Sequence, residues 1–119
     1  MLNSKKRICI ITSTRAEYGL LKHLMKEISS SDSLTLQIIA TGAHLSVQHG
    51  FTIDEIKKDG FFIDEIIDLD INDDSIHSVC QYLSKLTEKL STSFLRLSPD
   101  LLVILGDRYE LMSVVSTSL

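Results

Sequence analysis

The sequence predicts an α/β protein in which a parallel sheet carries helices on both faces. Short apolar runs typical of buried strands alternate along the chain with segments whose apolar residues recur at helical spacing. Right-handed crossover connections between such strands favour the order 3-2-1-4 of a Rossmann-like sheet. With 119 residues, of which 44% are hydrophobic, the chain suits one compact domain with its own core.

The first half of the chain predicts two strands and one helix. Arg7–Thr12 is a short run rich in isoleucine, and Leu34–Thr41 is a second apolar run, so both are predicted to be buried strands. Glu17–Ser29 lies between them and is predicted to be a helix. Its apolar stripe comprises Leu20, Leu21, Leu24, Met25 and Ile28. A polar, glycine-bounded loop, Gly42–Gly50, follows the second strand.

The middle of the chain predicts a short helix and a third strand. In Thr52–Asp59 the first residue and Glu55 have the spacing of a capping box, and Gly60 is placed to end the helix. Phe62–Leu69 alternates between apolar and polar residues, which indicates a strand.

The longest predicted helix comes next, and Asp73 or Asp74 is expected to cap it. Its apolar stripe comprises Ile76, Val79, Cys80, Leu83, Leu86, Leu90, Phe94 and Leu97. Pro99 cannot continue a helix and marks its end. Leu101–Leu105 is uninterrupted apolar sequence and predicts the fourth strand, and a further helix is expected from Tyr109 onward.

Charge and cysteine content exclude several classes of protein. The net charge of −4 does not suggest a general affinity for nucleic acid or anionic membrane. No apolar stretch approaches the roughly 20 residues of a membrane span, and the run Ile8–Ile11 is too short for a signal peptide, so we expect a cytoplasmic protein. Cys9 and Cys80 are expected to be small core residues rather than a disulfide, metal ligands or nucleophiles. We expect no metal and no cofactor.

The predicted strand order places a candidate site between the first and fourth strands. The winding of the sheet reverses there, and ligands of such sheets bind at the carboxyl ends of the strands. Arg15 follows the first strand and Arg108 the fourth, each at a predicted helix amino terminus. Free backbone N–H groups there favour an anion, and arginine adds forked donors, so the pair indicates a diphosphate site. Gly19 and Gly106 would let a ligand approach the backbone closely.

Other interpretations of these residues stay open. Arg15 can instead pair with Glu17 or Asp107 at the surface. Asp107 lies at the mouth of the fourth strand, where a carboxylate can move a proton on a substrate or cap the following helix, and the two roles are compatible. His44 follows the second strand, within reach of a ligand, although a loop histidine is often structural or solvated. For Tyr18, core packing is favoured over contact with a base or sugar.

Four motifs follow one another along the chain: Thr12–Gly19 (TSTRAEYG), Thr41–Leu45 (TGAHL), Phe51–Ile56 with Asp59–Phe61, and Gly106–Glu110 (GDRYE). Together they resemble the hydrolysing UDP-N-acetylglucosamine 2-epimerases, which include the bacterial enzymes of sialic and legionaminic acid synthesis. The resemblance implies a GT-B fold, with two Rossmann-like domains and the active site between them. Residues 1–119 would then be part of the first domain, with the second domain absent.

The resemblance also implies a reaction. UDP is eliminated from UDP-N-acetylglucosamine, and water then adds with inversion at C2 to give N-acetylmannosamine. Arg15, Ala16 and Arg108 would contact the nucleotide, with Gly19 and His44 as further candidate substrate-binding residues, and Asp107 would be the acid/base residue. Some relatives carry a histidine before the Gly-Asp-Arg turn, whereas this chain has Leu105, so no histidine role is carried over.

The rival functions are a non-catalytic nucleotide-binding module and a GT-B glycosyltransferase. We expect the isolated chain to be inactive, because the family's further catalytic residues lie beyond Leu119. We also expect a homo-oligomer, because an open apolar edge at Leu101–Leu105 invites pairing with a second copy.

Overall fold

The computed structural model describes residues 5–13, 15–41, 52–68, 75–105 and 117, without the side chains of residues 15, 16 and 52. Strands and helices alternate along the described chain. The elements in order are β1 (Lys6–Thr12), α1 (Arg15–Ser30), β2 (Leu34–Thr41), α2 (Thr52–Lys58), β3 (Glu65–Ile67), α3 (Ile76–Leu97) and β4 (Leu101–Ile104). The loop Gly42–Gly50 lies outside the described residues, as does the helix predicted from Tyr109 onward apart from the helical residue 117.

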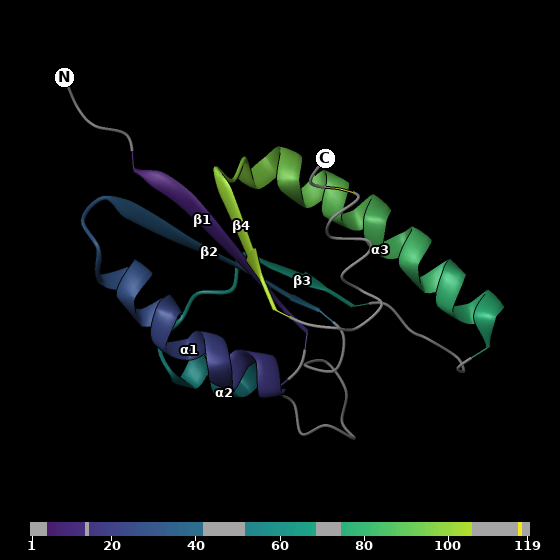
Figure 1. The fold of residues 1–119 in the computed structure, drawn as a ribbon, viewed down its shortest axis with the longest axis horizontal. Helices are drawn as coiled ribbons and strands as arrows, with labels where there is room; N and C mark the ends of the chain where they lie inside the picture. The colour runs from purple at the N-terminus through teal and green to yellow at the C-terminus, as the bar shows by residue number, and fades with distance from the viewer. Residues whose placement is uncertain (1–4, 14, 42–51, 69–74, 106–116, 118–119) are drawn as a thin grey trace.

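The four strands form one parallel sheet in the order β3-β2-β1-β4, as predicted. The central strand β1 pairs with β2 on one side and β4 on the other, so that Ile10 lies beside Ile38 and Val103. Figure 1 shows α1 and α2 on one face of this sheet and α3 on the other. Helices therefore cover both faces of the isoleucine-rich strands β1 and β2. Because both faces are buried, the sequences of these strands are almost continuously apolar.

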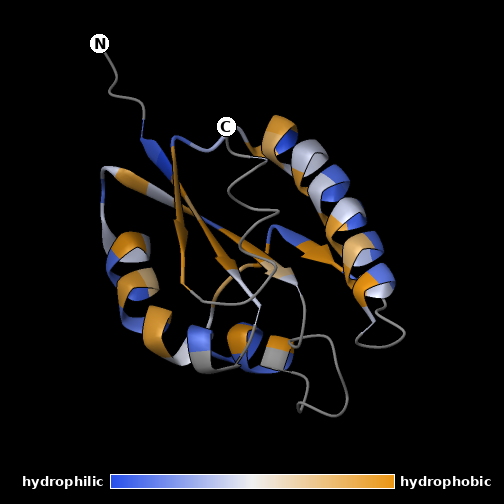
Figure 2. Ribbon diagram, turned by 45° about the vertical axis from the view of Figure 1, so that its right-hand side comes forward, coloured by the Kyte–Doolittle hydropathy of each residue, from blue (hydrophilic) through white to orange (hydrophobic). Residues whose placement is uncertain are grey.

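Each face of the sheet has its own apolar core, because successive side chains of a strand point to opposite faces. On β1, Ile8 and Ile10 pack beneath α1, whereas Cys9 and Ile11 pack beneath α3. Figure 2 shows the apolar strands enclosed between the two helical layers. The core under α1 and α2 contains Tyr18, Leu21, Met25, Ile28, Ile38, Ile56 and Phe61. The core under α3 contains Ile39, Ile67, Tyr82, Leu86, Leu90 and Leu97.

Strand β3 is shorter than predicted, spanning Glu65–Ile67 instead of Phe62–Leu69. Asp64 explains its late start. The backbone N–H of Ile38 donates to the Asp64 carboxylate at 2.8 Å, so a side chain takes a place where the β ladder would have used a carbonyl. Phe62 is 79% exposed, and Leu69 lies outside the described residues.

Helix α3 has the predicted length, but three details differ. Its N-cap is Ser75, whose hydroxyl accepts from the backbone N–H of Ser78 at 3.2 Å, rather than Asp73 or Asp74. Ile76 is 85% exposed, and Cys80 is exposed as well. The buried face passes through Tyr82, two residues and about 200° around the helix from Cys80. The prediction that Cys80 is a core residue is therefore wrong.

Helix α1 begins two residues earlier than predicted, at Arg15, and its buried stripe is displaced. The side chains that reach the core are Tyr18, Leu21, Met25 and Ile28. Leu20 is 74% and Leu24 43% exposed, so the prediction that both belong to the core stripe is wrong. No helix among the described residues combines the length and apolar character needed to cross a membrane.

Candidate functional site

The site is framed by the neighbouring ends of β1 and β4. Ile11 of β1 lies directly beside Ile104 of β4, so both strands reach the same edge of the sheet together. The ends of β1 and β4 are therefore neighbours, as the strand order predicts. Gly106, Asp107 and Arg108 lie outside the described residues. That the guanidinium groups of Arg15 and Arg108 share one pocket stays a prediction.

The end of β1 is tied to the first turn of α1 by a partly buried hydrogen bond. Thr12 is fully buried and Ser13 is 8% exposed. The backbone N–H of Ser13 donates to Oε1 of Glu17 at 2.9 Å, so Glu17 reaches back across the first turn of α1. Arg15 and Ala16 are the first two residues of this helix. Because the first N–H groups of a helix have no partner inside it, this end of α1 presents donors suited to an anion.

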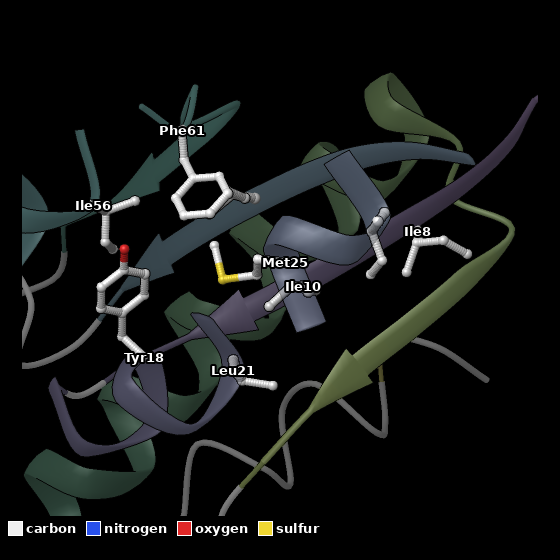
Figure 3. Packing of buried hydrophobic residues seen from close by; sticks show 9 residues of the cluster. Ile8, Ile10, Tyr18, Leu21, Met25, Ile56 and Phe61 are labelled. Atoms are coloured by element: carbon white, nitrogen blue, oxygen red, sulfur yellow. The ribbon is translucent and has the colours of Figure 1, made fainter. Parts of the chain in front are cut away.

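Tyr18, the fourth residue of α1, joins this first turn to the residue that follows α2. Its side chain is 1% exposed, and its ring meets Phe61 edge-on, with centroids 6.5 Å apart. The hydroxyl donates a hydrogen bond to Oδ2 of Asp59, and Nζ of Lys22 lies 3.1 Å from the same oxygen. Figure 3 shows the Tyr18 side chain reaching across the core toward Ile56 of α2. The expected core position of Tyr18 is confirmed.

This contact perturbs both acids. Burial, and then the hydrogen bond to Asp59, raise the pKa of Tyr18. The same hydrogen bond, and then the one from Lys22, lower the pKa of Asp59. At neutral pH the pair is therefore a neutral hydroxyl donating to a carboxylate. The predictions from the sequence did not include this pairing. The spacing of Tyr18 and Lys22 places both on one side of the helix, but it does not identify Asp59 as their partner.

The other candidate residues stand as follows. Gly19 is the fifth residue of α1, is exposed, and has nothing within 4 Å of the position a Cβ would take. His44 lies outside the described residues.

Thr41 at the end of β2 is 1% exposed, and its Oγ1 has no hydrogen-bond partner within the described part of the chain. Cys9 is fully buried, which confirms its expected core position. Burial raises the pKa of its thiol to about 12.

Comparison with known proteins identifies the family. Residues 26–119 match the family described as UDP-N-acetylglucosamine 2-epimerase. The chain belongs to this family. It is 49% identical over 116 residues to a GDP/UDP-N,N'-diacetylbacillosamine 2-epimerase (hydrolyzing) of Campylobacter jejuni, covering 98% of this chain and 30% of that protein. It is 33% identical to the UDP-N,N'-diacetylbacillosamine 2-epimerase (hydrolyzing) of Legionella pneumophila, covering 91% and 29%. The chain thus spans just under a third of the length of these curated relatives.

A solved structure supports the fold independently. The UDP-GlcNAc 2-epimerase of Neisseria meningitidis, determined with UDP-GlcNAc bound, superimposes with a TM-score of 0.76 at 12% identity. The match covers 94% of this chain and 29% of that structure. At this identity the likeness establishes the fold alone. It confirms the Rossmann-like sheet as the type found in GT-B epimerases.

Proposed function

We propose that these residues belong to a hydrolysing 2-epimerase that acts on a UDP-linked 2-acetamido sugar. One observation carries the proposal: β1 and β4 end side by side, and the two motif-bearing segments, Thr12–Gly19 and Gly106–Glu110, follow directly from those ends in a chain that belongs to the family. UDP-N-acetylglucosamine, giving N-acetylmannosamine and UDP, is the substrate that the family description supports.

A second substrate is supported by the relatives. Both curated relatives described above carry names that specify the nucleotide-linked N,N'-diacetylbacillosamine, and the identity to the first is 49%. We therefore propose UDP-N,N'-diacetylbacillosamine as the alternative substrate, converted to UDP and the C2-inverted free sugar. Assaying the two UDP-sugars side by side decides between them.

The proposed chemistry assigns a role to each candidate residue. Removing the C2 proton and breaking the bond from C1 to the diphosphate oxygen gives a glycal and free UDP. Water then adds to C1 while a proton returns to C2 on the opposite face. Arg15, Arg108 and the backbone at Ala16 would stabilise charge that grows on the leaving diphosphate. Asp107 would act as the acid/base group at C2.

Gly19 and His44 keep the weaker role of lining the substrate site. The exposed position of Gly19 on α1 leaves room beside the helix. The place of His44 in the sequence, three residues after β2 ends at Thr41, supports a position near the carboxyl-terminal edge of the sheet.

We also propose the wider setting. Residues 1–119 would form a Rossmann-like domain of a two-domain protein, and catalysis would need residues outside this segment, since relatives are more than three times as long. Pairing between copies is supported by β4, which lies at the edge of the sheet that the described residues form, with Leu101 56% exposed. A role in making sialic-acid-type sugars is supported by the motif resemblance. A cytoplasmic location is supported by the two cysteines being free thiols.

The deciding experiment is Asp107→Asn in a full-length protein that contains this segment. We expect release of free sugar to fall by about 100-fold or more, as for loss of a general acid/base, while UDP binding measured by calorimetry is retained. Asp100→Asn is the matched control, because Asp100 lies at the opposite end of β4 and pairs with the backbone N–H of Arg7 at 2.7 Å. Its activity should match wild type.

The outcomes separate the rival functions. If the wild-type protein binds UDP but releases no sugar, it is a nucleotide-binding module. If the sugar appears only on an acceptor, it is a glycosyltransferase. Free sugar carrying solvent deuterium at C2 is the outcome expected for the epimerase.

A further inference from the structure

The face of the sheet covered by α1 and α2 contains a polar cluster of Tyr18, Lys22 and Asp59, called here the Tyr18–Asp59 brace. The Tyr18 hydroxyl and the Lys22 ammonium both contact Oδ2 of Asp59. Tyr18 and Lys22 are one turn apart on α1, while Asp59 directly follows α2. One carboxylate at the end of α2 thus binds two successive turns of α1, which restrains α1 against rotation and sliding.

The brace acts close to the amino terminus of α1. Tyr18 is the fourth residue of the helix, so it belongs to the same first turn as Arg15 and Ala16. The preceding residue, Glu17, accepts from the backbone N–H of Ser13 at 2.9 Å. Side chains at consecutive helix positions point about 100° apart. The first turn is therefore held from two directions, by the residue that follows β1 through Glu17 and by the residue that follows α2 through Tyr18.

Asp59 is itself held in place. Its backbone N–H donates to the carbonyl of Glu55 at 3.0 Å, which continues the hydrogen bonding of α2. The next residue, Gly60, has φ of 94°, a conformation that ends the helix and that residues with a side chain rarely adopt. The Phe61 ring then packs edge-on against Tyr18. The position of Asp59, the hydrogen-bond acceptor of the brace, is thus fixed by the backbone at the end of α2.

We propose that Tyr18 and Asp59 are positioning residues for the diphosphate site, holding the first turn of α1 in the orientation that the departing UDP requires. This inference rests on the proposed function. Donors that stabilise developing charge work best when they are fixed before the reaction. The charge on the diphosphate is larger in free UDP and in the transition state than in the intact nucleotide sugar. Loss of the brace should therefore weaken those two states more than substrate binding.

Tyr18→Phe in the full-length protein tests the proposal, because it removes the hydroxyl and keeps the packed ring. We expect kcat to fall about 10-fold and Kd for UDP to rise about as much, which is less than the ~100-fold loss from an ångström-scale misplacement. KM for the nucleotide sugar should change by about two-fold or less. A residue that only stabilises the fold would lower Tm and leave the kcat and UDP affinity of the folded protein unchanged.

Variants of Asp59 provide the rescue test. Asp59→Asn keeps an oxygen acceptor for the Tyr18 hydroxyl, whereas Asp59→Leu removes it. We expect the loss of kcat and UDP affinity to follow the order Asp59→Leu, then Asp59→Asn, then wild type. Asp59 is partly exposed, so these variants also serve if Tyr18→Phe does not fold. Arg96→Gln is the matched control, since Arg96 ties α3 to Glu65 at 2.6 Å on the other face of the sheet. It should leave kcat and UDP affinity unchanged.

The readouts keep the two proposals separable. If the wild-type protein binds UDP but shows no epimerase activity, the proposed function fails, and the order of UDP affinities still decides whether the brace positions the site. If Tyr18→Phe and Asp59→Leu keep wild-type kcat and UDP affinity in an active enzyme, the brace is structural only and the inference is overturned. It is equally overturned if the wild-type protein has no affinity for UDP.

Discussion

The two faces of the sheet are built in different ways. On one face, α1 with 16 residues and the 7-residue α2 share the cover, and a polar brace joins them. On the other, the 22-residue α3 provides the helical cover within the described part of the chain. Buried residues recur along α3 from Tyr82 to Leu97, so its position is fixed by packing along most of its length. A 7-residue helix is marginal by itself and depends on tertiary contacts. On the face that α1 and α2 share, the contact of Tyr18 and Lys22 with Asp59 therefore fixes the position of α2 relative to α1.

The polar ties of the two faces also differ in position. On the α3 side, Gln37 of β2 donates to the Leu97 carbonyl at 2.8 Å, and Arg96 binds Glu65, the first residue of β3. On the α1 side they gather at the first turn of α1, directly after β1 ends. The α1 face is thus reinforced at the edge where a ligand of such a sheet binds. The comparison separates the ties of the α3 face from the Tyr18–Asp59 brace, which we propose to hold the candidate site.

Truncating either core tests whether the two faces contribute equally to stability, and this is the largest expected effect. Met25 under α1 and Leu86 under α3 are both fully buried. Met25→Ala and Leu86→Ala should each lower the free energy of unfolding by about 2–5 kcal/mol, through lost apolar burial and the cavity left behind. Urea unfolding provides the measurement. A loss below about 1 kcal/mol for one of them would show that its face can collapse around the gap.

Acid provides an intermediate test, because the pKa of Asp59 is lowered by the Tyr18 hydroxyl and by Lys22. The carboxylate is favoured in the folded state, so its contribution is complete above the unfolded pKa of about 3.9. That contribution is lost as the pH falls from there through the lower folded pKa. Wild-type Tm should drop in this acid range, and Asp59→Asn should drop less steeply. Equal slopes would mean that the brace contributes nothing to stability.

Asp100 gives the same test at the other end of the sheet. The pKa of Asp100 is lowered, mainly by the hydrogen bond from the backbone N–H of Arg7. Burial opposes this shift, and the positive charge of Arg7 adds to it. Asp100→Asn should therefore also flatten the acid limb of the stability curve. Unlike Asp59→Asn, it should do so without any change in affinity for UDP.

Sequence periodicity predicted what depends on neighbours along the chain. The limits of β2 and the end of α3 before Pro99 are as predicted, and crossover handedness was sufficient for the strand order. The errors arise where a contact from another element decides. Asp64 delays β3 by binding Ile38, and the phase of α3 against the sheet exposes Cys80. The spacing of residues along the chain determines neither the start of β3 nor the exposure of Cys80.

The candidate site also has a feature that was predictable from the sequence and others that were not. The adjacency of the β1 and β4 ends follows from topology and was predictable. The partnership of Tyr18 with Asp59 joins residues 41 positions apart, and nothing in the spacing of either residue specifies the other. The roles of Arg15, Ala16, Arg108, Asp107 and His44 depend on side-chain directions, which topology does not determine, so these roles stay predictions.

The smallest expected effect is that of replacing Arg96. Its guanidinium donates several hydrogen bonds, both to the Glu65 carboxylate and to a backbone carbonyl. Its guanidinium contacts Glu65 through Nε at 3.2 Å and Nη2 at 2.6 Å, and donates to the Asp64 carbonyl at 2.8 Å. The Arg96 side chain is nonetheless 55% exposed, and exposed pairs contribute about 0–1 kcal/mol because water screens them. Arg96→Gln should lower the unfolding free energy by that amount, and less in high salt. A larger loss that persists in high salt would mean that the α3 face, too, depends on a polar tie rather than on packing along its length.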